Sequence, residues 1–280
     1  MTAVRAVLLD LDGTLTDGVG GPALPGAIDA VRRLRARVPV RFVTNTTSRT
    51  RAWLADALSR AGFGAETGDI VNPMSVARVV LAERSHAEGI LLAAPDSLPE
   101  LSWYRPTTPE RARSVLLATE GHDLSIGDLA PAIEALLGGA RLYTLQANRL
   151  FQRDGRLVSD TGPLAAFLGY AAEVPWENLG KPSPLLFGQV AGALGVRLAE
   201  LAMCGDDAEF DASGAVAAGL GAGVLVRTGK YRPGAEARVT PAPSRVIDHI
   251  GELESVLELA PCSGAPCAAS QRSARSATRA

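Results

Sequence analysis

The chain has little of what would direct it to nucleic acid, to a membrane or to a disulfide-rich fold. Aromatic residues make up only 5% of the 280 residues and the formal net charge is -2, so neither base stacking nor a basic surface favours nucleic-acid binding. No apolar run is long enough to cross a bilayer. The three cysteines suggest no disulfide framework, and the first residues show no signal-peptide pattern. We therefore expect a cytoplasmic protein with no nucleic-acid or membrane partner.

Short apolar runs alternate with helical periodicity near the N-terminus, and the hydrophobic content of 47% is enough for a sizeable core. Residues 3–9 and 40–43 are typical of buried parallel strands. Pro25 opens a helix after the first strand, and Ser48 can cap a helix after the second. This alternation of strand and helix predicts a parallel sheet wound with helices, the α/β class.

The same alternation returns after residue 178. Ser183 and Pro184 suit the N-cap and the first position of a helix. Further elements are expected as strands at 201–204 and 223–226, an alanine-rich helix between them, a short strand at 246–247 and a closing helix at 250–257. The two stretches would form one sheet.

Residues 70–177 separate the two stretches and are expected to form an α/β insert. Residues 1–69 and 178–259 would then make one discontinuous core. The chain from 260 to 280 has no periodicity and little bulk, so we expect a disordered tail. Within the insert, strands are predicted at 89–92, 114–118 and 141–145, and helices at 74–83 and 129–137.

Asp10 and Asp12 follow the first predicted strand. Side chains two residues apart on an extended chain point the same way, so both carboxylates can share one site at the strand's carboxyl end, where wound sheets bind ligands. Two such carboxylates repel each other unless a cation or a shared proton relieves them, and Mg²⁺ prefers oxygen ligands. One carboxylate could attack phosphorus while the other transfers the proton. Taken alone, such a motif is more often an acidic turn.

Polar residues mark three further strand ends or helix starts. Thr44 and the amides that follow it would bind phosphate oxygens, although such runs are ordinary N-caps. Lys181 would screen charge on a phosphorylated carboxylate, although a solvated lysine before a helix looks the same. Asp206 is placed to ligate a metal and Asp211 to support it, and a helix dipole explains only part of this acidic run. Each signal is modest, but their order and placement together favour one site.

Four motifs in this order resemble the haloacid dehalogenase-like (HAD) superfamily of phosphohydrolases: Asp10-Leu11-Asp12-Gly13-Thr14, Thr44-Asn45, Gly180-Lys181-Pro182, and Gly205-Asp206 with Asp211. The large insert between the second and third motifs resembles the type IIA cap subclass. Within that subclass, segments 180–184 and 226–233 are most similar to phospholysine phosphohistidine inorganic pyrophosphate phosphatase-like proteins. The resemblance covers residues 4–258 and implies a Rossmann-like core with an inserted α/β cap.

This resemblance implies a Mg²⁺-dependent phosphohydrolase that acts on a small phosphorylated substrate through an aspartyl-phosphate intermediate. Asp10 would be the nucleophile and a metal ligand. Asp12 would be the general acid/base, and its backbone carbonyl would also reach the metal. Asp206 would be the second carboxylate ligand, with Asp211 behind it. The phosphoryl group would be held by Thr44, Asn45 and Lys181.

The cap usually sets substrate choice, and it is where this sequence departs most from the better-known relatives. Asn148 and Arg149 align with a basic cap segment, so Arg149 is a candidate to bind the substrate, although an exposed arginine more often has no such role. Lys230 and Arg232, expected beyond the final core strand, carry the same reservation. The resemblance also implies a homodimer through the cap.

Alternatives stay open on the sequence alone. The same mechanism would serve phosphoramide, pyrophosphate or phosphoprotein substrates, and a phosphotransferase would share the intermediate but keep water from it. A dehalogenase of the superfamily is less compatible, because it needs neither Asp12 nor Asp206. A non-catalytic phosphate-binding protein on the same scaffold would not need both Asp10 and Asp12.

Overall fold

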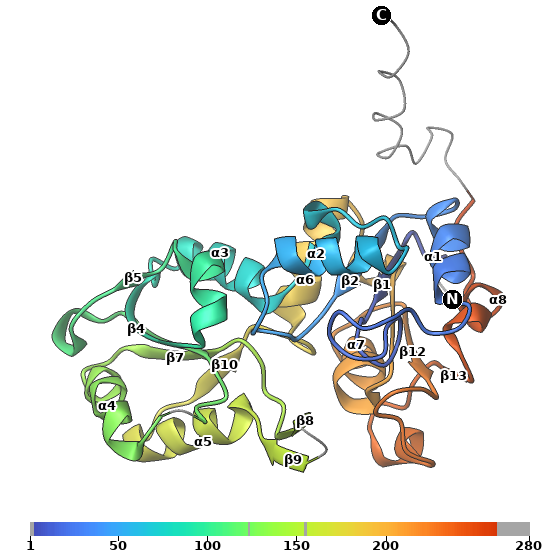
Figure 1. The fold of residues 1–280 in the computed structure, drawn as a ribbon. Coiled ribbons are helices and arrows are strands. Elements are labelled where there is room, and N and C mark those ends of the chain that lie inside the picture. The colour runs from blue at the N-terminus through green and yellow to red at the C-terminus, as the bar shows by residue number, and fades with distance from the viewer. Residues whose placement is uncertain (1–2, 123, 154–155, 262–280) are drawn as a thin grey trace, which may run out of the picture.

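The computed structural model describes residues 3–122, 124–153 and 156–261, which form two parallel sheets side by side (Figure 1). The larger sheet has six strands, in the order β13 (Arg245–Ile247), β12 (Ala222–Val226), β11 (Leu201–Gly205), β1 (Ala6–Leu9), β2 (Val40–Val43) and β3 (Ile70–Val71). Every neighbouring pair in it is parallel. The predicted wound parallel sheet is therefore confirmed, with β1 near its middle.

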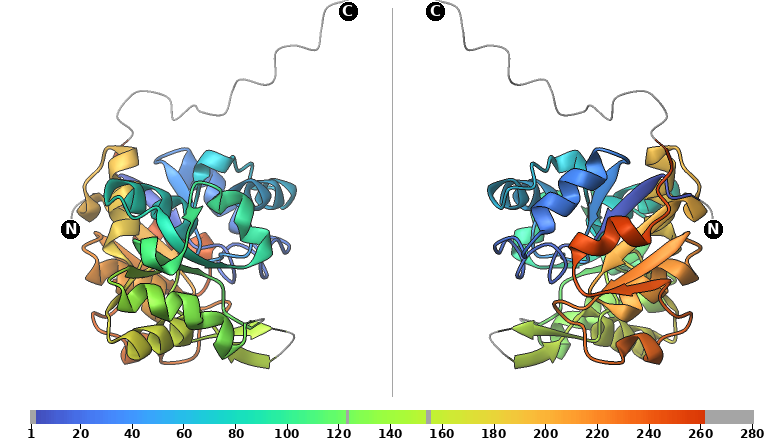
Figure 2. Two further views of the ribbon diagram at one scale, coloured as in Figure 1. Left: turned by 90° about the vertical axis from the view of Figure 1, so that its left-hand side faces the viewer. Right: turned by 90° about the vertical axis from the view of Figure 1, so that its right-hand side faces the viewer.

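Helices cover both faces of the six-stranded sheet, because successive side chains of each strand point to opposite faces. Val7 and Leu9 pack on one face with α1 (Ala27–Arg35), α2 (Arg51–Arg60) and α8 (Leu253–Val256). Ala6 and Leu8 pack on the other face with α3 (Pro73–Glu83), α6 (Pro184–Leu194) and α7 (Gly214–Ala217). Figure 2 shows this layering from both ends. A strand buried on both faces explains why residues 6–9 form an unbroken apolar run.

The smaller sheet belongs to the inserted segment and is called the cap sheet below. Its order is β10 (Trp176–Asn178), β7 (Arg141–Thr144), β6 (Ser114–Ala118), β4 (Glu88–Ala93) and β5 (Arg105–Pro106), all parallel. One face packs on α4 (Ala130–Leu137) and α5 (Thr161–Ala172). The other face joins the apolar cluster that holds α3 and α6, so the two sheets share buried contacts.

A β-hairpin and several short turns complete the described chain. The hairpin pairs β8 (Leu150–Arg153) with β9 (Arg156–Ser159). Short 3-10 segments lie at Thr67–Asp69, Pro95–Leu101, Pro109–Arg111, Ile126–Leu129, Leu198–Glu200, Ala235–Arg238 and Ile250–Glu252, and a π-helical turn lies at Ala208–Ser213. Within the described ranges, no helix is both long and apolar enough to span a membrane.

The boundary between the two sheets differs from the one drawn on the sequence. β3 pairs with β2 in the six-stranded sheet, although residues from 70 onward were assigned to the insert. β10 pairs with β7 in the cap sheet, so Asn178 lies on the cap side. At the C-terminal end, the Ala260 amide donates to the Val4 carbonyl, and residues 262–280 of the predicted tail lie outside the described residues.

The first turn of α2 is capped by Thr50 rather than by Ser48, and the sequence prediction is wrong here. The Thr50 side chain accepts a hydrogen bond from the Trp53 amide at 3.2 Å, and its backbone is extended as an N-cap requires. Ser48 lies two residues before the cap. Several Thr and Ser residues here could cap the helix about equally well. The packing of Leu54 and Leu58 into the core therefore decides at which residue α2 begins.

We expect Thr50→Ala to lower the free energy of unfolding by about 1 kcal/mol, because an N-cap side chain satisfies an otherwise unpaired helix amide. Ser48→Ala is the matched control and should change it by less than about 0.5 kcal/mol, as is usual for surface positions. Urea denaturation of both variants measures the difference. Equal losses in the two variants would contradict this capping assignment.

Candidate active site

The carboxyl ends of three adjacent strands meet at one edge of the six-stranded sheet. Asp10 follows β1, Thr44 follows β2 and Asp206 follows β11. The register holds these ends level, because Leu9 lies opposite both Phe42 and Cys204. Open α/β sheets bind ligands at this edge. The sequence prediction that separate motifs come together there agrees with this geometry.

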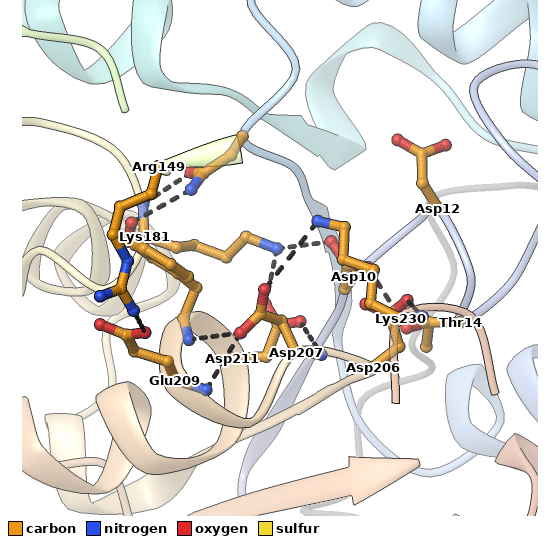
Figure 3. A network of polar contacts seen from close by, with 12 residues as sticks. Asp10, Asp12, Thr14, Arg149, Lys181, Asp206, Asp207, Glu209, Asp211 and Lys230 are labelled. Atoms are coloured by element: carbon orange, nitrogen blue, oxygen red, sulfur yellow. Dashed lines mark hydrogen bonds and ion pairs between the residues drawn. The ribbon is translucent and has the colours of Figure 1, made fainter. Parts of the chain in front are cut away.

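Three carboxylates form the centre of the site and are called the acidic group below: Asp10, Asp206 and Asp211. One oxygen from each lies within 4.8 Å of the others, and all three side chains are buried. The Lys181 ammonium contacts two of them, at 2.5 Å from Asp10 Oδ1 and 2.7 Å from Asp211 Oδ1 (Figure 3). One ammonium offsets only part of this negative charge, so the group retains an excess.

A π-helical turn brings Asp211 back over the end of β11. The sequence predicted an alanine-rich helix here, and the structure widens its first turn into a π-turn before α7 begins. The Asp207 side chain caps the turn by accepting from the amides of Glu209 and Phe210. Asp211 then lies against Gly205, where a Cβ would come within 2.1 Å of Asp211 Oδ2. Such single π-turns are frequent at functional sites.

Two glycines let the loops close around Asp206. A Cβ on Gly13 would lie 2.1 Å from Asp206 Oδ2, and a Cβ on Gly229 would lie 2.0 Å from the same atom. Both glycines have positive φ, 83° and 54°, which other residues adopt only with strain. The Lys230 amide donates to Asp206 Oδ2 at 2.7 Å. Asp206 is thus fixed by backbone from the loop after β12, a contact that strand-end reasoning did not predict.

Asn45 positions Lys181 through its side chain. Its amide group donates to the Lys181 carbonyl at 3.1 Å and accepts from the Lys181 amide at 2.7 Å. The resemblance assigned Asn45 to the phosphoryl group, but this paired contact commits both polar atoms of the side chain to Lys181. One hydrogen of Nδ2 and the backbone amide of Asn45 are left for such a role. Thr44 is buried, and its hydroxyl accepts from the Thr46 amide at 3.0 Å.

Asp12 lies apart from the acidic group. Its carboxylate accepts from the Thr46 hydroxyl at 3.3 Å, and Figure 3 shows it set away from Asp206 and Asp211. Asp10 has a different set of partners, with Thr14 donating to Oδ2 at 3.2 Å and Lys181 bound to Oδ1. The two acids of the first motif therefore have separate surroundings, which is a condition for separate chemical roles.

Burial raises the pKa of Asp10, Asp206 and Asp12. It raises the pKa of Asp10 to about 7, against the lowering effect of Lys181 and with further raising by Asp211 and Asp12. It raises the pKa of Asp206 to about 8, helped by the charges of Asp10 and Asp211. It also raises the pKa of Asp12, while Lys181, Lys230 and Thr46 oppose it. Carboxyls with raised pKa values cluster at functional sites.

The acidic group fits a divalent cation. Its carboxylate oxygens are ligands that Mg²⁺ prefers, they converge within the span of one ion, and their excess charge would be neutralised by it. Among the residues that the structure describes, this is the group of acids, histidines and cysteines close enough to hold an ion. The cysteine beside it, Cys204, is buried in the sheet, where burial raises its pKa far above the usual thiol value.

Arg149 reaches the core but not the acidic group. Its guanidinium pairs with Glu209 at 3.0 Å, and both side chains are mostly exposed. The pair links the cap segment before β8 to the π-turn that carries Asp211.

Sequence reasoning also gave little weight to Lys230, whose side chain projects over the acidic group in Figure 3. Lys230 follows β12, and no acidic motif ends that strand, so the sequence did not indicate that Lys230 lies at the site.

Comparison with known proteins agrees with the fold. A haloacid dehalogenase-like hydrolase family model matches residues 7–101, and a HAD-hydrolase-like model matches residues 178–253. The chain is 33% identical to phospholysine phosphohistidine inorganic pyrophosphate phosphatase of Bos taurus, over 92% of this chain and 95% of that protein. It is 34% identical to haloacid dehalogenase-like hydrolase domain-containing protein 2 of Homo sapiens, over 89% and 96%.

Two solved structures share the fold. A glycerol phosphate phosphatase from Mycobacterium tuberculosis, in complex with magnesium, is 25% identical with a TM-score of 0.75, covering 91% of this chain and 77% of its own. A p-nitrophenyl phosphatase from Archaeoglobus fulgidus is 20% identical with a TM-score of 0.82, covering 91% and 100%. The second likeness concerns the fold alone.

The chain belongs to the haloacid dehalogenase-like hydrolase family and is a phosphatase of that family. The resemblance drawn from its motifs is confirmed, as is the fold class, an α/β parallel-sheet core with an inserted α/β cap.

We expect the metal-free protein to lose thermal stability as the pH rises from 5 to 8, and Mg²⁺ to oppose this loss. The Asp206 carboxyl titrates near 3.8 when unfolded and near 8 when folded, so the folded state binds more protons between these values and stability falls with rising pH. A cation bound only by the folded state replaces the proton's effect. The melting temperature, measured against pH with EDTA or Mg²⁺, checks this.

Asp206→Asn is the matched control, because it removes this titration while keeping the side-chain shape. Its melting temperature in EDTA should decline less over the same pH range, and Mg²⁺ should raise it less than in the wild type. Parallel pH profiles for the two proteins would show that the acidic group does not set the dependence.

Proposed function

We propose that the protein is a Mg²⁺-dependent phosphatase that removes a phosphoryl group from a small phosphorylated substrate through an aspartyl-phosphate on Asp10. The observation that carries the proposal is the pairing of Asp10 with Lys181 inside the acidic group. One oxygen of Asp10 binds the ammonium, while the other accepts a hydrogen bond from the Thr14 hydroxyl. The second oxygen is therefore the one suited to attack phosphorus.

In the first step, Asp10 Oδ2 attacks phosphorus and the bond from phosphorus to the leaving group breaks. The leaving oxygen takes a proton from the Asp12 carboxyl. The raised pKa of Asp12 supports this role, because burial favours the protonated form that an acid must have at the start. The Thr46 hydroxyl, bound to Asp12 Oδ2, fixes the direction in which this carboxyl points.

In the second step, Asp12 takes a proton from water, and that water attacks phosphorus of the aspartyl-phosphate. Phosphate leaves and the Asp10 carboxylate is regenerated, so protons and bonds balance over the cycle. Asp10, Asp206 and the backbone carbonyl of Asp12 would hold Mg²⁺, with Asp211 behind them. When bound there, Mg²⁺ supplies positive charge that draws a phosphate oxygen to the nucleophile and offsets developing negative charge.

The rest of the site is assigned to phosphate and substrate. Thr44 and the backbone of Asn45 lie at the end of β2, next to the nucleophile, and would bind phosphoryl oxygens. Lys181 neutralises Asp10, which lets a dianionic phosphate approach a carboxylate. Arg149 pairs with Glu209 at the exposed edge of the site, and we assign it no contact with the phosphoryl group.

A second candidate is hydrolysis of phosphoramide or pyrophosphate bonds by the same two steps. The names of the mammalian relatives, which include phospholysine, phosphohistidine and inorganic pyrophosphate, favour it. The similarity to the glycerol phosphate phosphatase from Mycobacterium tuberculosis, solved with magnesium, favours an ester instead. A phosphoprotein phosphatase and a non-catalytic phosphate-binding protein remain as further alternatives. Dimerisation through the cap and a cytoplasmic location stay predictions.

We expect the purified protein to hydrolyse p-nitrophenyl phosphate with Mg²⁺ and to lose this activity in EDTA. Asp10→Asn should abolish turnover because the amide cannot act as the nucleophile. Asp12→Asn should lower kcat by about 10²- to 10⁴-fold, the usual contribution of a general acid/base. Thermal stabilisation by Mg²⁺ should survive in Asp12→Asn, since only its backbone would contact the metal.

Asp56→Asn is the matched surface control, because Asp56 is an exposed acid on α2. It should keep wild-type kcat. Full activity of Asp10→Asn would refute the assigned nucleophile, and a wild type inactive on every tested phosphate ester, phosphoramidate and pyrophosphate would refute the enzyme.

A further inference from the structure

Lysine occurs at only two positions in the printed sequence, 181 and 230, and the other 26 of the 28 basic residues are arginine. Both lysines lie at the active site. Lys181 is buried and its ammonium is committed to Asp10, to Asp211 and to the Val43 carbonyl. Lys230 has no part in the mechanism described above. Because the chain otherwise uses arginine, lysine at position 230 suggests a role that arginine would not fill.

The backbone of Lys230 is fixed against the metal-binding loop. Its amide donates to Asp206 Oδ2 at 2.7 Å. Thr228 donates its hydroxyl to the Gly13 carbonyl, and a Cβ on Gly229 would lie 2.5 Å from the Gly13 Cα, so the loops touch. The root of the Lys230 side chain is therefore held in a constant position beside the acidic group.

The side chain of Lys230, in contrast, is held weakly. It is 58% exposed, and its ammonium lies 3.9 Å from Asp207 Oδ2, which is beyond hydrogen-bond distance. Burial lowers the pKa of Lys230, but the charges of Asp10, Asp206, Asp207 and Asp211 outweigh it and raise the pKa above its usual value. Among the described residues no hydrogen bond holds the ammonium, so it keeps donors for another ligand.

Asp207 does not depend on Lys230. Its Oδ1 accepts from the amides of Glu209 and Phe210 at 3.0 and 3.1 Å, so the carboxylate keeps two partners when the ammonium moves away. If the Lys230 ammonium moved from Asp207 to a substrate oxygen, the Asp207 carboxylate would still be hydrogen-bonded.

The Lys230 ammonium projects over the acidic group, beside the face of the site that the cap overlies. The charge of Lys230 interacts with acids of the core. Burial raises the pKa of Asp160 in the cap, and the charge of Lys230 lowers it by a smaller amount. Asp160 is the N-cap of α5 and is buried in the cap. An ammonium that projects over the acidic group and whose charge also reaches the cap can meet a group that a substrate carries beyond the transferred phosphoryl group.

We propose that Lys230 is a specificity-determining residue that binds an anionic group carried by the leaving group, which favours diphosphates over simple monophosphate esters. The proposal rests on the proposed function and names a substrate class for it. A lysine suits this task better than arginine, because it is a compact charge on a flexible stem that can turn from Asp207 to a phosphate oxygen. An arginine would tend to bind Asp207 through two parallel hydrogen bonds and stay there.

Binding of two non-hydrolysable probes to the full chain, in Mg²⁺ and followed by calorimetry, tests this. Methylenediphosphonate carries a second phosphonate group that methylphosphonate lacks. Lys230→Met should weaken methylenediphosphonate binding by about 10- to 100-fold, the usual range for a hydrogen bond to a charged group. The loss for methylphosphonate should be at least ten times smaller. Lys230→Arg should recover little of the discrimination, because its guanidinium would stay on Asp207.

Arg238→Met is the matched control, since it removes one exposed positive charge from the same connection between β12 and β13. It should leave both dissociation constants unchanged. Equal weakening of the two probes by Lys230→Met, no weakening of either, or an equal effect of Arg238→Met would overturn the proposal. If wild-type protein hydrolyses p-nitrophenyl phosphate but Lys230→Met does not discriminate, only this inference fails. If the probes behave as expected and no phosphate is hydrolysed, only the proposed function fails.

Discussion

A buried ammonium among carboxylates is the interaction on which the site depends. Lys181 is 3% exposed and contacts Asp10 and Asp211 at once. Removing one member of a buried ion pair leaves an unpaired charge, which destabilises a protein by roughly 3–5 kcal/mol. Asn45 holds the Lys181 backbone on both sides, so the loop after β2 and the loop before α6 are tied to the same charge. Segments far apart in sequence are therefore brought to one point by one amine.

The remaining charge makes the site a place for a cation and a phosphate in turn. Burial, and after it the charges of neighbouring carboxylates, raises the pKa values of Asp10 and Asp206. A metal-free site relieves this by holding protons. A divalent cation relieves it without them, and then leaves Asp10 ionised as a nucleophile. Glycines at 13, 205 and 229 make the crowding possible, because any side chain there would collide with an Asp206 or Asp211 oxygen.

The core and its acids could be predicted from sequence because their signals are local. A buried parallel strand is an apolar run, and β1, β2, β11 and β12 each end where their runs end. The cap was harder. Helix α5 contains Gly162, Pro163 and Gly169, which obscure its periodicity, and it was missed. Asn45 pairs with Lys181, which lies 136 positions away in the sequence. Lys230 binds Asp206, which lies 24 positions away. Local sequence spacing does not predict contacts over such separations.

The use of lysine at both positions follows from what the carboxylates must do. A guanidinium binds a carboxylate through two parallel hydrogen bonds and occupies both of its oxygens. The Lys181 ammonium instead takes one oxygen of Asp10 and one of Asp211, so Asp10 Oδ2 stays available for attack. Arginine at 181 would neutralise the acid but also block it. The same reasoning applies at 230, where a single weak contact to Asp207 leaves the charge able to move. Lysine therefore suits positions 181 and 230, where a positive charge must neutralise a carboxylate and leave one of its oxygens available.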